Sequence, residues 1–318
     1  MHLNIFAEGL EPLDMTATDE FRSLLKSADD LGIGYDDGAR YLSHNIVLRH
    51  RRFHYLEWGV RGNPPILLLH GGHQSAHSWD LVSLNLSDRY HIFALDQRGH
   101  GDSEWSRDGE YSPSAMADDA QDFIAAMGLE QPIIFGHSMG GLVSMTLLKR
   151  DPSIARAAVL VDVGPEVGGA GVGMIRDFIK TAVEFDDLED FVSRVQSYDP
   201  FRSREHIERT VRYNMMRRAD GKYVSKCDRP VGASREHSSE SSPQPGRGIT
   251  LEDIGSFSCP TLVVRGGQSN VLEPEAAERF ANALPDGQLV TVDRCGHNVH
   301  SQNTPGFLEA TTPFLAAL

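Results

Sequence analysis

The stretch from Pro132 to Gly141 constrains the fold of this chain more than any other, because it joins an apolar run to the pattern Gly-His-Ser-Met-Gly. An apolar run between proline and glycine predicts a buried strand, and G-x-S-x-G after a strand is typical of a sharp turn that exposes a serine at the start of a helix. Glycines two residues to either side leave room for a strained backbone. Ser138 is therefore the candidate nucleophile.

Strand and helix patterns alternate on both sides of this turn. Runs of mainly apolar residues, typical of strands buried on both faces of a sheet, are found at residues 66–69, 92–95, 157–163 and 261–264. Helical patterns are found near residues 75–86, 112–127, 274–284 and 304–318. The alternation predicts an α/β protein with a mostly parallel sheet.

The alternation stops twice, which divides the chain into three parts. Residues 1–44 are interpreted as an N-terminal extension with one amphipathic helix at Thr18–Leu31. Residues 45–165 and 254–318 form the predicted α/β core. Residues 166–253 are predicted to form a helical cap or lid, with helical patterns near 174–185, 188–195 and 206–216 and a flexible loop near 231–248, where Ser, Pro, Gly and Arg dominate.

Composition disfavours several classes of partner. Acidic residues outnumber basic ones by 45 to 30, and the net charge of −15 disfavours binding to phosphate backbones. The three cysteines, Cys227, Cys259 and Cys295, form no C-x-x-C pair, which favours a reducing, cytoplasmic location. We find no basic leader before an apolar run and no apolar window of about 18 residues, so neither a signal peptide nor a membrane span is expected. The expected partner is a small-molecule substrate, with no nucleic acid and no membrane, and a homodimer is compatible with the sequence.

A serine hydroxyl needs a base before it can attack, and a histidine in a late loop is the expected base. In the chain order Ser, acid, His, that loop follows the last strand, where Gly296-His297 stands. His297 is the predicted base. Two backbone N–H groups must also hold the negative charge of a tetrahedral intermediate. Met139, directly after the serine, and Gly72, in the loop His70-Gly71-Gly72, are the predicted donors of this oxyanion hole.

Together these motifs resemble the α/β-hydrolase-fold family, in particular its esterases and lactonases. The resemblance rests on residues 70–72 (HGG), 96–103 (DQRGHGDS), 136–140 (GHSMG) and 296–297 (GH), in that order, and spans residues 45–318. It implies a mostly parallel eight-stranded sheet with helices on both faces and an inserted helical cap. It also implies a cofactor-independent serine hydrolase that cleaves a carboxylic ester or lactone of a small, largely apolar substrate through an acyl-enzyme.

The third catalytic position departs from the family pattern. Members usually carry an aspartate in a Gly-x-x-Asp pattern after the strand equivalent to residues 261–264, whereas this chain has asparagine there, at Asn270. An amide cannot stabilise an imidazolium as a carboxylate does. Asp162, at the end of the strand after the nucleophile helix, is the predicted acid, because some relatives carry the acid on that strand. The alternative is that the third member stands at Asn270 and that Asp162 belongs to an ordinary turn.

Other functions stay open on the sequence alone. The same residues could hydrolyse a carbon–carbon bond or catalyse a lyase reaction, and a scaffold without its carboxylate could bind a small ligand without turnover. No cofactor is expected. No metal is expected either, because no acidic or cysteine ligand stands at a recognisable spacing from His70, His73, His77 or His100. Three charged residues of the loop after residue 95 are predicted to be structural: Asp96, Arg98 and Asp102.

Overall fold

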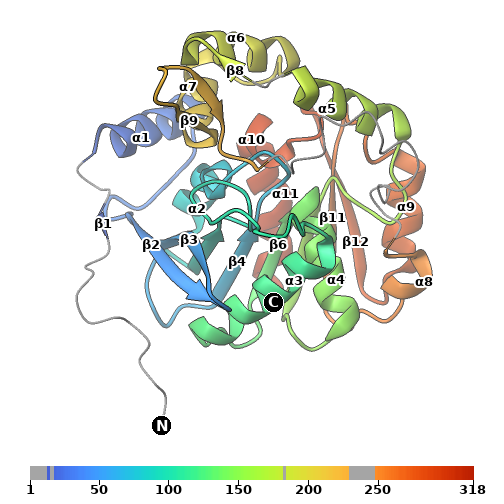
Figure 1. Ribbon diagram of the computed structural model, residues 1–318. Helices are drawn as coiled ribbons and strands as arrows, with labels where there is room; N and C mark the ends of the chain where they lie inside the picture. The colour runs from blue at the N-terminus through green and yellow to red at the C-terminus, as the bar shows by residue number, and fades with distance from the viewer. Residues whose placement is uncertain (1–12, 15–17, 182–183, 229–247) are drawn as a thin grey trace.

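The computed structural model describes residues 13–14, 18–181, 184–228 and 248–318. One large sheet runs through the middle of the molecule (Figure 1). Its strands are, in spatial order, β1 (Leu13–Asp14), β2 (Tyr41–Leu48), β3 (Arg51–Trp58), β5 (His91–Leu95), β4 (Pro65–Leu69), β6 (Ile133–His137), β7 (Ala157–Val161), β11 (Thr261–Gly266) and β12 (Gly287–Val292).

The prediction of an eight-stranded, mostly parallel sheet is confirmed. The six strands from β5 to β12 in this order are parallel to one another, while β2 and β3 are antiparallel. The two-residue strand β1 adds a further pairing at the edge of β2. Parallel strands end at the same edge of the sheet, so the loops that follow β4, β6, β7, β11 and β12 meet there.

The central strands are buried on both faces. In β4, Leu67 and Leu69 pack into one apolar cluster and Ile66 and Leu68 into another, because successive side chains of a strand point to opposite faces. The first cluster includes side chains of α3 (Pro113–Met127), α4 (Met139–Arg150), α8 (Leu251–Ile254) and α9 (Pro274–Ala283). The second includes those of α1 (Asp19–Leu31), η1 (Ala76–Trp79), α2 (Asp80–Leu86), α10 (Val299–Gln302) and α11 (Thr304–Ala316).

The insertion, which we define as residues 166–248, lies over the edge of the sheet where the parallel strands end (Figure 1). Its described elements are α5 (Gly169–Thr181), β8 (Glu184–Phe185), α6 (Leu188–Tyr198), α7 (Arg204–Val211), η2 (Arg212–Asn214), β9 (Met215–Arg217) and β10 (Tyr223–Ser225). The flexible loop predicted near 231–248 lies almost wholly outside the described residues.

The expectation of a helical cap is wrong in one part. Strands β8, β10 and β9 form a small antiparallel sheet, and the helix predicted over residues 206–216 ends at Val211. The cause is a tight turn between β9 and β10, in which Gly221 has a φ of +92° and Arg218 N–H donates to the Lys222 carbonyl at 2.8 Å. Glycine adopts this left-handed conformation without strain, so the turn favours strand pairing over helix.

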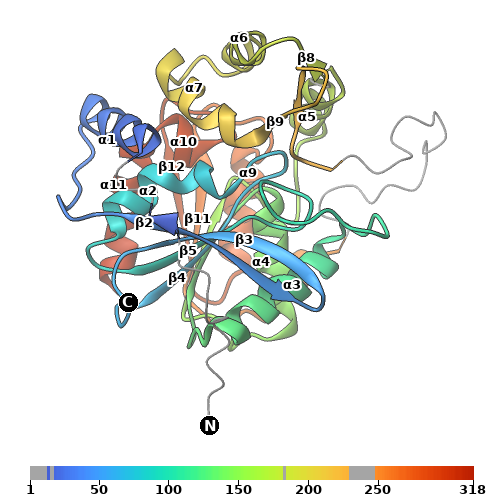
Figure 2. The ribbon, with the colours of Figure 1, turned by 60° about the vertical axis from the view of Figure 1, so that its left-hand side comes forward.

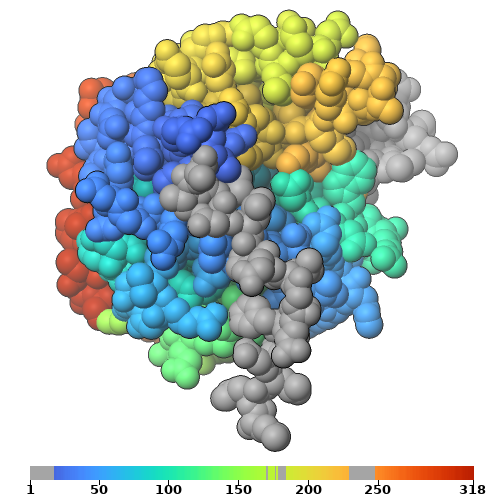
Figure 3. Space-filling model, turned by 90° about the vertical axis from the view of Figure 1, so that its left-hand side faces the viewer, coloured from blue at the N-terminus to red at the C-terminus, as the bar shows by residue number. Residues whose placement is uncertain are grey.

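A buried ion pair holds the insertion to the core. Arg209 of α7 donates from Nη1 to Oδ2 of Asp80 in α2 at 2.8 Å, and each side chain is only 2% exposed. Removing one partner of such a pair leaves an uncompensated buried charge. Helix α1 lies beside α7 (Figures 2 and 3) and also packs Phe21 against Trp58 of β3. The described part of the predicted extension is therefore integral to the core.

The core also resumes earlier in the chain than the predicted boundary at residue 254. Ile249 and Ile254 are buried in the same apolar cluster as Phe280 of α9, so the core resumes before residue 254. No helix in the described ranges is long and apolar enough to cross a membrane.

Candidate active site

Ser138 stands in a strained turn between β6 and α4. Its φ of +50° lies in the left-handed region, which is costly for a residue with a side chain. The flanking glycines are needed because the chain passes very close to itself. A Cβ on Gly140 would collide with the Leu69 carbonyl oxygen, and a Cβ on Gly136 would lie 2.6 Å from the Gly140 carbonyl oxygen. The turn predicted from the sequence therefore forms and presents Ser138 at the start of α4.

Asp162 follows β7 and is completely buried. Its carboxylate accepts three hydrogen bonds: from Nδ1 of His297 at 2.8 Å, from the Gly266 N–H at 3.0 Å and from the Ser269 hydroxyl. A buried carboxylate is costly unless its oxygens are bonded in this way. The arrangement leaves the carboxylate of Asp162 as an acceptor that holds the imidazole of His297 in one orientation.

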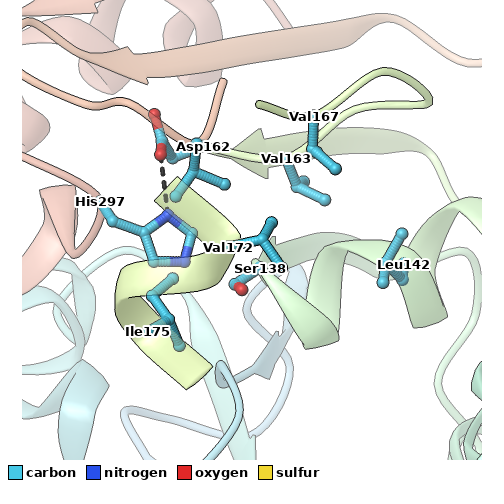
Figure 4. Close-up of a pocket in the computed structure, with 9 residues that line it drawn as sticks. Ser138, Leu142, Asp162, Val163, Val167, Val172, Ile175 and His297 are labelled. Atoms are coloured by element: carbon cyan, nitrogen blue, oxygen red, sulfur yellow. Dashed lines mark hydrogen bonds and ion pairs between the residues drawn. The ribbon is translucent and has the colours of Figure 1, made fainter. Parts of the chain in front are cut away.

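His297 lies in the loop after β12, between Asp162 and Ser138 (Figure 4). Its Nδ1 faces Asp162, so Nε2 is left for the cavity in which Ser138 lies. Its backbone is also held, because His137 donates from Nε2 to the His297 carbonyl at 2.9 Å. Among the residues drawn in Figure 4 no hydrogen bond joins His297 to Ser138, which is common before substrate binds.

Asn270, the alternative third member, points elsewhere. Its side chain is exposed, and its Nδ2 lies 3.1 Å from Sδ of Met174 in α5. The structure thus brings Asp162, and not Asn270, to His297. Sequence reasoning missed Ser269, whose hydroxyl binds Asp162. The only signal for it was a hydroxyl residue inside the loop that departs from the family pattern.

The predicted oxyanion loop is tied to the nucleophile turn. The Gly140 N–H donates to the His70 carbonyl at 3.1 Å, which brings the end of β4 against the start of α4. His70 accepts from the Gln97 N–H at Nε2 and faces the Gly71 carbonyl through Nδ1, and burial lowers its pKa to about 4. It is therefore a neutral structural side chain at pH 7. Met139 is the first residue of α4, so its N–H has no acceptor within the helix.

A cavity of about 120 Å³ adjoins Ser138 and His297. Apart from Asp162, its other lining residues are all apolar, and they comprise Leu142, Val163, Val167, Val172, Ile175 and Val271. Two of them, Val172 and Ile175, come from α5, so the insertion supplies part of the wall (Figure 4). The described lining contains neither lysine nor arginine. The cavity therefore suits an uncharged, apolar group.

The loop after β5 is structural, as predicted. Asp96 accepts from His54 at 2.7 Å, from the Ala76 N–H at 2.6 Å and from the Asp102 N–H at 2.9 Å. Arg98 forms a buried ion pair with Asp119. In the described chain, His54, Asp96 and Asp102 bring ligand atoms within 4.8 Å of one another. Asp102, however, is exposed and paired with Lys226, and Asp96 is already occupied by protein donors. These contacts explain the cluster without a metal.

The fold and this constellation define a class, and comparison with known proteins agrees. The chain belongs to the α/β-hydrolase fold family, whose model matches residues 64–304. It is similar to the esterase Rv0045c of Mycobacterium tuberculosis, with 26% identity over 303 residues, 93% of this chain and 95% of that protein. The crystal structure of Rv0045c matches with a TM-score of 0.74 at 26% identity, over 95% of this chain and 99% of the other.

A second similar protein is the 2-(acetamidomethylene)succinate hydrolase of Mesorhizobium japonicum. It is 26% identical over 264 residues, which cover 81% of this chain and 90% of that protein. The prediction of an α/β-hydrolase-fold enzyme is thus confirmed at the level of the family. The relatives are an esterase and a hydrolase of a succinate derivative, so the likeness defines a hydrolase without defining the bond that it cleaves.

Proposed function

We propose that this protein hydrolyses carboxylic esters or lactones that have small, uncharged acyl groups. Ser138 is the proposed nucleophile, His297 the base and Asp162 the acidic member of the triad. The observation that carries the proposal is the 2.8 Å contact between Asp162 Oδ2 and His297 Nδ1, on a cavity that Ser138 also lines. A histidine between a serine and a buried carboxylate is the arrangement that activates a hydroxyl group for acyl transfer.

The mechanism follows from which atoms face one another. Asp162 holds the proton of His297 on Nδ1, so Nε2 takes the proton of Ser138 as its oxygen attacks the carbonyl carbon. The N–H groups of Gly72 and Met139 stabilise the oxyanion. Nε2 then protonates the leaving alkoxide, and a water molecule, activated by the same histidine, releases the acid from Ser138. Each oxyanion donor contributes about 10²–10³ in rate in such sites.

The cavity supports a small, uncharged acyl group. Its volume of about 120 Å³ is below the roughly 150 Å³ of an engineered apolar cavity that binds benzene, so it holds an acyl chain of only a few carbons. A dicarboxylate, such as the succinate derivative that the Mesorhizobium relative hydrolyses, would have to bury a charge with no cation in the described lining. Since α5 supplies two of the wall residues, the proposed role of the insertion is that of a cap.

The test is kcat/KM on p-nitrophenyl esters of increasing acyl length, with a panel of γ- and δ-lactones alongside. We expect the highest values for short acyl chains and a loss of about 10⁶ in kcat for Ser138→Ala, the size of effect seen when a triad serine is removed. A serine-directed fluorophosphonate is the second readout. Labelling of Ser138 without turnover of any ester or lactone would overturn the assigned bond and favour carbon–carbon cleavage or a lyase reaction. No labelling and no turnover would favour a ligand-binding protein.

A further inference from the structure

A cysteine and two histidines meet where the insertion joins the core, and none of the three lines the cavity beside Ser138. Cys227 Sγ lies 3.3 Å from Nε2 of His100 and 3.9 Å from Nε2 of His73. Cys227 follows β10, His100 lies in the loop after β5, and His73 directly follows Gly72. The three residues are far apart in the chain, which is why sequence spacing did not connect them.

The orientation of His100 is fixed by its other ring nitrogen. Its Nδ1 lies 3.0 Å from the Arg98 carbonyl oxygen, to which it donates, so Nε2 is directed at the sulfur of Cys227. A histidine held in this way can donate a proton to a thiolate and keep it charged. His70, whose ring centroid lies 5.3 Å from that of His100, does not compete because both of its ring nitrogens are used by backbone groups.

The other groups near the sulfur are already paired. The Asp228 carbonyl oxygen lies 3.5 Å from Sγ, and the Asp228 carboxylate accepts from the hydroxyl of Tyr111. The neighbouring Lys226 is bound to Asp102 at 2.7 Å. The histidines are therefore the groups that set the protonation of this thiol.

The three cysteines of the chain differ sharply in their surroundings. Burial alone would raise the pKa of the Cys227 thiol, but the charge and hydrogen bond of His100, helped by His73, lower it to about 5. Burial raises the pKa of Cys259 and raises that of Cys295 to about 11. Cys227 is 9% exposed beside the partly buried His73, whereas Cys295 is fully buried. Cys259 and Cys295 are thus controls within the same molecule.

We propose that Cys227, with His100 and His73, is a reactive thiolate site that hydroperoxides oxidise. The sulfur attacks the terminal oxygen of the hydroperoxide, a sulfur–oxygen bond forms and the oxygen–oxygen bond breaks. Sulfur is oxidised by two electrons to a sulfenic acid, and the peroxide is reduced. The departing alkoxide, or hydroxide from hydrogen peroxide, takes the proton from Nε2 of His100, which leaves an alcohol or water and a neutral imidazole.

Thiol chemistry gives the expected reactivity of Cys227 relative to that of an ordinary cysteine. At pH 6 an ordinary cysteine is about 0.3% thiolate, whereas a thiol with a pKa near 5 is about 90% thiolate, a ratio of about 300. Nucleophilicity falls with pKa, with a Brønsted slope of about 0.4–0.5, which removes roughly a factor of 40. The advantage that remains is about tenfold at pH 6. It is lost near pH 7, and by about pH 9 an ordinary thiol, which is then mostly thiolate, reacts faster because of its higher nucleophilicity.

The experiment uses the full chain and limiting iodoacetamide at pH 6 and pH 9, with the alkylation of each cysteine followed by peptide mass spectrometry. We expect Cys227 to react at least about tenfold faster than Cys259 and Cys295 at pH 6. In His100→Gln, the rate of Cys227 alkylation should fall about tenfold at pH 6 and should be no lower than in the wild type at pH 9. In a parallel sample, hydrogen peroxide followed by dimedone should label Cys227 and spare the other two.

Two results would overturn the proposal, and the first needs no variant. Cys227 in the wild-type protein could react no faster than Cys259 and Cys295 at pH 6, or take up no dimedone after peroxide. Alternatively, His100→Gln, with a thermal melting curve that shows it to be folded, could keep the wild-type rate at pH 6. The first result would show that Cys227 is not a reactive thiolate that hydroperoxides oxidise, and the second that the histidines do not maintain a thiolate.

Discussion

The loops after β7 and β11 leave neighbouring parallel strands at the same edge of the sheet, yet only one of them brings a side chain to His297. Asp162, in the first loop, is buried and lies 2.8 Å from Nδ1 of that histidine. Asn270, in the second, is exposed and contacts Met174 of the insertion. The comparison teaches that a place at the shared sheet edge is not enough to reach the histidine, because the direction in which each loop presents its side chain decides the contact.

The second loop has a different part in the site. Its Gly266 N–H and Ser269 hydroxyl both donate to the Asp162 carboxylate. The backbone of Asp162 is strained, with a φ of +50°, and its N–H donates to the Val264 carbonyl of β11 at 2.7 Å. The loop in which the family pattern places the acid therefore supports, in this chain, the carboxylate of Asp162 after the neighbouring strand, which we propose as the acid.

The largest difference between the two loops should appear when the carboxylate of Asp162 is neutralised. Asp162→Asn keeps the shape but removes the charge that stabilises the imidazolium and fixes its tautomer. We expect kcat for a short-chain ester to fall by about 10⁴, as for the equivalent change in a serine protease. Steady-state kinetics check this, with a melting curve to show that the variant is folded. A fall of less than tenfold would remove Asp162 from the mechanism.

Moving the carboxylate to the second loop should not restore activity. In the double variant Asp162→Asn with Asn270→Asp, the new carboxylate points toward α5 and away from His297, as Asn270 does now. We expect kcat to stay at least about 10³ below the wild type. Recovery to within tenfold of the wild type would show that the two loops are interchangeable and that the orientation of residue 270 does not decide the site.

A smaller effect is expected at Ser269, which acts on His297 only through Asp162. Ser269→Ala removes one hydrogen bond to a buried carboxylate, a loss of about 1–2 kcal/mol, and we expect kcat to fall about tenfold with KM nearly unchanged. Ser87→Ala is the matched control, since Ser87 is equally buried and binds a backbone carbonyl away from the site. Equal kinetics for the two variants would show that Ser269 has no part in positioning the acid.

The smallest effect is expected at Asn270 itself. Asn270→Ala removes a contact with Met174 of α5, a helix that also lines the cavity. We expect kcat to stay within about twofold and KM to change by no more than a few-fold, because loss of a wall contact acts on binding and not on the chemical step. A tenfold fall in kcat would assign Asn270 to the catalytic machinery.

Most of the core could be predicted from the sequence because its signals are local. Apolar runs such as Ile66–Leu69 are buried on both faces, and the glycines around Ser138 are needed for its turn. The choice between Asp162 and Asn270 could not be predicted in the same way. It depends on which way each loop turns at the sheet edge, because both residues follow neighbouring strands but only Asp162 reaches His297.

The insertion was harder to predict because its signals conflict. Met215 continues an apolar helical pattern, but the turn at Gly221 draws it into a strand. The contact of Cys227 with His100 had no signal at all in the sequence, since it depends on how the insertion packs against the loop after β5. Long-range contacts of this kind come from tertiary packing, which a local pattern does not encode.

The most direct test of the proposed triad is the rate at which a fluorophosphonate labels Ser138, because labelling reports activation of the serine whatever the natural substrate is. The measurement compares the wild type with Asp162→Asn and Asn270→Ala at pH 7. The account predicts labelling slowed by about 10³–10⁴ in Asp162→Asn and unchanged in Asn270→Ala. Labelling of Asp162→Asn at the wild-type rate, or an equal loss in both variants, would contradict it.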